Sequence, residues 1–100
     1  MKALPTLLLL AAVSAASTAA NPSRGEVLAA TCNTCHGPEG RGSPPLPPLR
    51  GRSDISKQLQ AWQTAPEATG VAHLMIRLAR GLSNADIDAL AAYYAEQEAP

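Results

Sequence analysis

The sequence is poor in aromatic side chains, with no Phe, one Trp and two Tyr in 100 residues. Charge is also sparse and balanced, because eight Lys and Arg residues face eight Asp and Glu residues. The chain therefore lacks the strongly basic patch that nucleic-acid binding requires, and we expect no nucleic-acid partner. The shortage of bulky apolar side chains also implies that so small a domain needs a bound group or a cross-link to be stable.

The first 20 residues have the layout of an export signal. Lys2 precedes an apolar run over residues 4–13, and small residues fill positions 14–20. A basic start, a short apolar centre and a small-residue end are typical of a cleavable secretory signal peptide. The run is shorter than the roughly 20 residues that span a bilayer, although a retained anchor is the alternative. We predict a signal peptide at 1–20 and one periplasmic domain at 21–100, without stable membrane insertion.

The two cysteines of the chain fall in one string, Cys32-Asn33-Thr34-Cys35-His36. C-x-x-C-H is the attachment site of a c-type haem. On a helical turn the two thiols lie on one face, where they can form thioethers with the haem vinyl groups. His36 follows on the same face and can bind the iron. The motif predicts one haem c, covalently bound through Cys32 and Cys35, with His36 as a metal ligand.

Two other kinds of site use closely spaced cysteines. A redox disulfide in a C-x-x-C motif is found next to a βαβ unit, and no strand pattern is present here. A structural zinc site needs four ligands, whereas His73 is the only Cys or His outside the motif. Haem fits better than either, and it agrees with the export signal because covalent haem attachment takes place outside the bacterial cytoplasm.

The patterning of residues 21–100 is helical. Capping side chains followed by apolar residues at helical spacing predict helix starts at Ser23, Ser53 and Ser83, with a further helix over 71–80. Four prolines within residues 43–48 exclude regular helix or a central strand there. Gly81 is placed at the C′ position, where it would end the helix before it. We therefore expect an all-α fold with about four helices.

The order of these elements resembles a class I c-type cytochrome. A helix runs into C-x-x-C-H, a proline-containing loop follows, and a methionine precedes the last helix. The string MIRLARGLSNAD over residues 75–86, continued by LAAYY over 90–94, is similar to the cytochrome subunit of flavocytochrome c sulfide dehydrogenase. The resemblance implies a small fold wrapped around one covalent haem. Many such subunits carry two haem domains, and this chain has one C-x-x-C-H motif.

The resemblance also implies the remaining haem contacts. Met75 is the natural second axial ligand, because it is the only methionine after residue 20 and a thioether favours ferrous iron. It is otherwise a core filler, and His73 is the rival ligand, since one regular helix cannot turn both toward the iron. Residues 47–51 look like the P-x-L-x-G stretch of the class, which implies that the Pro47 carbonyl accepts the Nδ1–H of His36. A stiff polyproline linker is the alternative.

Two further groups of residues are expected to support this arrangement. Gly25 and either Tyr93 or Tyr94 are predicted where the terminal helices cross, because glycine lets an aromatic ring approach closely. Arg50 and Arg52 are candidates to pair with a haem propionate, although single arginines in loops are usually solvated.

Iron bound by both His36 and Met75 has no open position, so we expect one-electron transfer and no enzymatic activity of the domain itself. The resemblance implies a flavoprotein sulfide dehydrogenase as the partner that donates electrons. A free carrier serving a terminal oxidase or reductase is the alternative. A catalytic or sensing haem protein would require Met75 to leave the iron.

The charge pattern favours a permanently bound subunit over a free carrier. Free carriers steer brief encounters with rings of like charge, and no such run is present. Obligate interfaces are apolar in their core. The residues expected to frame an exposed apolar haem edge are Leu46, Leu49, Val71, Leu74 and Ile76.

Overall fold

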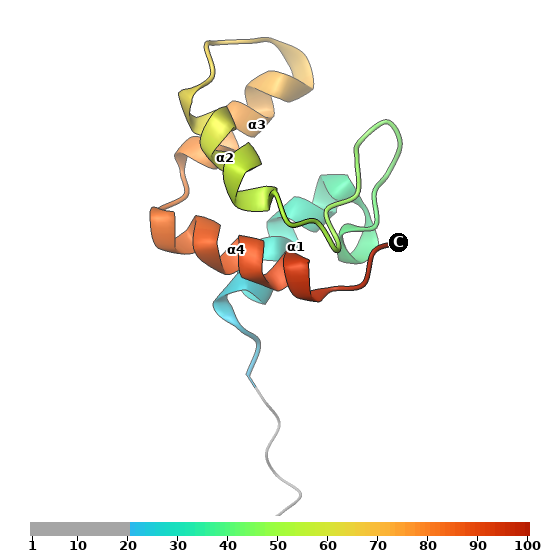
Figure 1. Cartoon of the computed structure of the whole chain (residues 1–100). Coiled ribbons are helices and arrows are strands. Elements are labelled where there is room, and N and C mark those ends of the chain that lie inside the picture. Colours follow the sequence, from blue (N-terminus) through green and yellow to red (C-terminus); the bar gives the residue numbers. More distant parts are fainter. Residues whose placement is uncertain (1–20) are drawn as a thin grey trace, which may run out of the picture.

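A computed structural model describes residues 21–100, and the predicted signal peptide lies outside the described residues. The elements are α1 (Arg24–His36), the 3₁₀ turn η3 (Pro38–Gly40), α2 (Ile55–Thr64), α3 (Gly70–Arg80) and α4 (Asn84–Glu96) (Figure 1). Over residues 21–100 no strand forms, and a single isolated bridge joins Ser43 to Leu46. The predicted all-α fold of about four helices is confirmed. None of the helices in this range is long and apolar enough to cross a membrane.

The starts of α1 and α4 follow from their capping residues. The Ser23 hydroxyl accepts a hydrogen bond from the Glu26 amide at 3.1 Å. At α4 the Ser83 hydroxyl accepts from the Asp86 amide at 3.0 Å, and the Asp86 carboxylate accepts from the Ser83 amide at 3.2 Å. Each such cap satisfies amide groups that have no partner within the helix, and is worth about 1 kcal/mol.

The ends of α2 and α3 differ in detail from the expectation. Asp54 occupies the N-cap of α2 without capping it, because its carboxylate is bound by the Arg52 guanidinium at 2.7 and 2.8 Å. Gly81 ends α3 as predicted, and as the C-cap residue it has φ −83° in place of a left-handed conformation. Its amide instead donates to the Leu78 carbonyl at 3.1 Å, and the chain leaves α3 through a right-handed turn.

α1 crosses α4 (Figure 1), and this crossing depends on Gly25. A Cβ atom at this position would overlap the carbonyl oxygen of Ala89 and lie 2.7 Å from the Cβ of Tyr93. Only glycine allows the two helices to approach this closely. The aromatic residue at the crossing is therefore Tyr93, whereas Tyr94 is buried deeper in the molecule.

The core receives one to three side chains from each helix. Its members are aliphatic or small apart from one tyrosine, and they are Ala29, Ile55, Leu59, Ala79, Ile87, Leu90 and Tyr94. α1 packs on α4, and α2 packs on both α3 and α4 (Figure 1). This arrangement leaves the end of α1 facing α2, α3 and the loop over 41–54, where the candidate site lies.

Candidate functional site

The last turn of α1 presents the cysteine motif. Cys32 is partly buried, Cys35 is exposed, and both carry free thiols. The helix ends at His36 because Gly37 adopts φ +89°, a conformation that favours glycine. The chain then folds back, and the Gly42 amide donates to the His36 carbonyl at 2.6 Å. The motif is thus held at a sharp, glycine-dependent turn.

An apolar cavity of about 470 Å³ opens beside the motif. All five residues predicted to contact a haem line this cavity, and they are Cys32, Cys35, His36, Pro47 and Met75. Much of the remaining wall is aliphatic or aromatic, including Leu28, Ile55, Trp62, Leu78 and Leu90. Cofactor pockets typically measure about 300–1,000 Å³ and are mostly apolar with few placed polar groups. The size, the apolar wall and the thiol, imidazole and thioether groups together fit a haem.

The hydrogen bonding of His36 leaves one ring nitrogen available for a metal. His36 is buried, and its Nδ1 lies 2.8 Å from the carbonyl oxygen of Pro47. Because a carbonyl can only accept, Nδ1 carries a proton, and in the neutral imidazole Nε2 keeps its lone pair. A metal-binding histidine is commonly oriented in this way by a carbonyl behind it.

The loop that carries the Pro47 carbonyl is fastened at its base. The amides of Leu49 and Arg50 both donate to the Gly40 carbonyl, at 2.8 and 3.1 Å. The Gly51 amide donates to the Tyr94 carbonyl at 2.8 Å and so joins the loop to the end of α4. These bonds place a proline-rich segment without regular structure at a defined distance from α1.

Met75 and His73 lie on different sides of α3. Met75 lines the cavity, whereas His73 does not. The Nδ1 atom of His73 lies 3.4 Å from a carboxylate oxygen of Glu67. This contact has the distance of an ion pair without the alignment of a hydrogen bond, so Nδ1 has no hydrogen-bond partner among the described residues. The geometry thus brings Met75, and not His73, to the same space as His36.

Tyr94 belongs to the site although sequence reasoning assigned it to packing. Its hydroxyl donates to the Asn33 side-chain oxygen at 2.5 Å, and its ring lines the cavity. Burial raises the pKa of Tyr94 and also that of the Cys32 thiol. A Cβ at Gly40 would lie 2.7 Å from the Tyr94 ring. Asn33 occupies a variable position of C-x-x-C-H, so the motif gave no signal for this contact.

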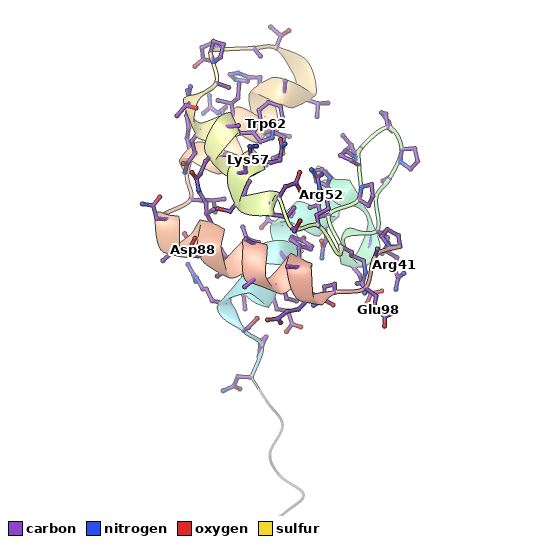
Figure 2. The ribbon with its side chains drawn as sticks, viewed as in Figure 1. Arg41, Arg52, Lys57, Trp62, Asp88 and Glu98 are labelled. Carbon is purple, nitrogen blue, oxygen red and sulfur yellow. The ribbon has the colours of Figure 1, made fainter. Side chains whose placement is uncertain are left out.

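The two candidate propionate partners have different surroundings. Arg52 lines the cavity and is bound to Asp54, and this hydrogen bond lowers the pKa of the Asp54 carboxyl group. Figure 2 labels Arg52 in the segment just before α2, and Trp62 within that helix. Arg50 donates to two main-chain carbonyls and does not line the cavity. Of the two, only Arg52 is placed to face a group in the cavity.

A second hollow, of about 420 Å³, lies between α2 and α4. It is mostly polar, and its lining consists of Gln60, Gln63, Thr64, Asn84, Ile87 and Asp88. It contains no Cys, His or Met side chain, so it offers none of the groups that hold a haem.

An all-helical chain whose C-x-x-C-H turn faces an apolar cavity defines a c-type haem protein. The comparisons agree, because the cytochrome c family model matches residues 22–97. The chain belongs to the cytochrome c family, in its class I, and its cofactor is haem c, attached through Cys32 and Cys35.

Three characterised relatives support the family assignment. Cytochrome c-554(548) of Halomonas halodenitrificans is 39% identical over 83 residues, which is 80% of this chain and 100% of the relative. The thiosulfate dehydrogenase electron acceptor of Stutzerimonas stutzeri is 37% identical over 64% of this chain and 31% of its own length. Cytochrome c4 of Azotobacter vinelandii is 36% identical over 97% of this chain and 51% of its own length. None of these three names is that of a sulfide dehydrogenase subunit.

Proposed function

We propose that this protein is a periplasmic one-electron carrier whose haem iron is held between His36 and Met75. The observation that carries the proposal is the shared cavity. The Nδ1–H of His36 donates to the Pro47 carbonyl, which leaves Nε2 for the iron, and Met75 on α3 lines the same cavity. When bound, the haem supplies the redox chemistry. The periplasmic location is supported by the signal-like sequence of residues 1–20.

The surrounding residues set the conditions for electron transfer. With His36 and Met75 as ligands, the iron would have no position for a substrate, so the chain would serve to set the reduction potential and to keep water away from the iron. The apolar wall disfavours the additional positive charge of the ferric state, and a neutral thioether ligand acts in the same direction. The carbonyl behind His36 makes the imidazole more basic and acts in the opposite direction.

The ligand assignment is tested by paired substitutions on α3. Met75→Ala should abolish the weak charge-transfer band that ferric His/Met haem shows in the red, and should open the ferrous iron to carbon monoxide. His73→Ala, two residues earlier on the same helix, is the control and should leave the band unchanged. The reverse pattern would assign the second ligand to His73.

For the partner, we propose a redox protein that binds this chain through an apolar face. The candidate that the sequence resemblance favours is a flavoprotein sulfide dehydrogenase. Three side chains that line the cavity are also substantially exposed: Val71 at 58%, Leu74 at 47% and Leu78 at 41%. Ile76 was expected on this surface and is instead 1% exposed, and it does not line the cavity. Apolar side chains around a cofactor opening suit an obligate interface.

A free diffusible carrier is the second candidate. The match to cytochrome c-554(548) supports it, because the match covers the whole length of that relative and its name mentions no dehydrogenase.

The bound subunit and the free carrier differ in the salt dependence of electron transfer. A bound subunit should co-purify with its dehydrogenase and show little effect of ionic strength on the rate of electron transfer. For a carrier steered by its charges, this rate falls steeply as salt screens them. Purification as a lone monomer with salt-sensitive transfer would refute the subunit. Flavoprotein sulfide dehydrogenase and thiosulfate dehydrogenase should be compared as donors.

A further inference from the structure

Arg50 has an unusual set of partners for an arginine in a loop. Its side chain is 11% exposed, and its Nη1 donates to the Glu39 carbonyl at 3.2 Å. Its Nε donates to the Glu98 carbonyl at 3.0 Å. The nearest carboxylate oxygen, on Glu39, is 4.0 Å away. The guanidinium group therefore binds main-chain oxygens from two separate segments, η3 and the chain after α4, and not primarily a carboxylate.

Arg41, in the same region, binds differently. Its Nε and Nη2 atoms bind one carboxylate oxygen of Glu39 at 3.2 and 3.1 Å, and its side chain is 52% exposed. This is an ordinary surface ion pair. Figure 2 labels Arg41 and Glu98 at the same end of the molecule, beside η3 and the C-terminal segment. Arg41 thus provides a matched comparison for any substitution of Arg50.

Arg50 is connected to His36, the proposed haem ligand, through the loop that carries Pro47. Its main-chain amide donates to Gly40, so both its backbone and its side chain fasten the loop to η3. Three residues earlier in this loop, the Pro47 carbonyl accepts the Nδ1–H of His36 at 2.8 Å. Hydrogen bonds from a charged donor are stronger than those between neutral groups. Arg50 is therefore a main constraint on where the Pro47 carbonyl lies.

We propose that Arg50 is a positioning residue that tunes the reduction potential of the haem. By fastening the loop to η3 and to the C-terminal segment, it keeps the Pro47 carbonyl on His36 and the imidazole electron-rich. A more basic imidazole stabilises ferric iron and lowers the potential. This inference rests on the proposed role of His36 as an iron ligand.

The sign of the change in reduction potential distinguishes a positioning role of Arg50 from an effect of its charge. Removing a positive charge near the haem would stabilise ferric iron and lower the potential, whereas loosening the His36 hydrogen bond raises it. Arg50→Lys keeps the charge, but a single ammonium group lacks the planar fork that reaches two carbonyls. Arg50→Lys therefore isolates the positioning effect.

The experiment uses the holoprotein with Arg50→Lys and with Arg41→Lys as the control. We expect Arg50→Lys to speed solvent exchange of the His36 Nδ1–H, followed by NMR of the reduced protein, at least tenfold. We also expect the ferric-to-ferrous ratio, measured at the wild-type midpoint potential, to fall at least threefold. Arg41→Lys should change neither quantity.

Unchanged exchange in Arg50→Lys, or a lowered potential, would overturn the proposal. Should Arg50→Lys yield too little holoprotein, Arg50→Gln is measured instead; exchange must again accelerate, and unchanged exchange counts against the proposal in the same way. A failure of His36 as the iron ligand would be visible separately, because the wild-type spectrum would then lack low-spin His/Met features before any substitution is made.

Discussion

A single hydroxyl group joins the C-terminal helix to the cysteine motif. Tyr94 is 1% exposed, and its hydroxyl meets Asn33 across 61 positions of sequence. Asn33 lies between the two haem-binding cysteines, so this bond ties the attachment turn to the core. A buried polar group that loses its partner costs about 1–3 kcal/mol. The bond is therefore a significant part of the stability of so small a domain.

Tyr94→Phe should lower the free energy of unfolding of the holoprotein by about 1–2 kcal/mol, because Asn33 loses its partner. Tyr93→Phe makes the same chemical change one residue earlier and should cost less than about 0.5 kcal/mol. Denaturant unfolding measures both. Combining Tyr94→Phe with Asn33→Ala should cost less than the sum of the single changes. Equal losses for the two tyrosines would contradict this assignment.

The helices are positioned by close approach where α1 crosses α4. Gly25 has no room for a Cβ atom, since Ala89 and Tyr93 fill the space. By contrast, the nearest atom to a Cβ at Gly81 would be 3.5 Å away, an ordinary contact. The crossing in turn determines how α4 presents Tyr94 to the cavity. A local change in one element therefore reaches the site.

Gly25→Ala should destabilise the holoprotein by about 1–3 kcal/mol, the usual cost of overpacking a tight contact. Gly81→Ala is the matched control, and it should be neutral or stabilising by up to about 1 kcal/mol because Gly81 has an ordinary negative φ. Thermal melting followed at a helix-sensitive wavelength compares the two. A melting temperature for Gly25→Ala at or above that of the wild type would show that the helices can separate without cost.

At the scale of the whole molecule, the cavity of about 470 Å³ is large compared with a core of only seven buried side chains among residues 21–100. The core residues are few and mostly aliphatic, and the cavity wall draws on every helix. Ordering the backbone costs about 1–2 kcal/mol per residue, and these side chains offset only part of that cost. The covalent haem is thus expected to contribute to the fold as well as to electron transfer.

A Cys32→Ala/Cys35→Ala variant, which cannot attach haem, should be largely unfolded. Far-UV circular dichroism should show little helix, and heating should give no cooperative transition. Thr34→Ala lies in the same motif but keeps both thiols, so it should retain haem, helix content and a cooperative melt. Native-like helix with cooperative melting in the double cysteine variant would show that the apolar core suffices alone.

Much of this protein follows from residues close together in the sequence. The spacing of Cys32, Cys35 and His36 predicted the haem, and the family comparison agrees. The Ser83 cap and the apolar spacing in residues 84–94 predicted α4 correctly. Each of these depends on groups within about four positions of one another, which is the range of helical hydrogen bonds and of side chains on one helix face.

Only the tertiary structure decided which distant groups meet. It brought Arg50 to Glu98 and Tyr94 to Asn33, placed Met75 on the cavity side of α3, and buried Ile76 against expectation. These contacts join groups far apart in sequence. They form only when the interactions made by the folded chain as a whole offset the conformational entropy lost in bringing distant segments together.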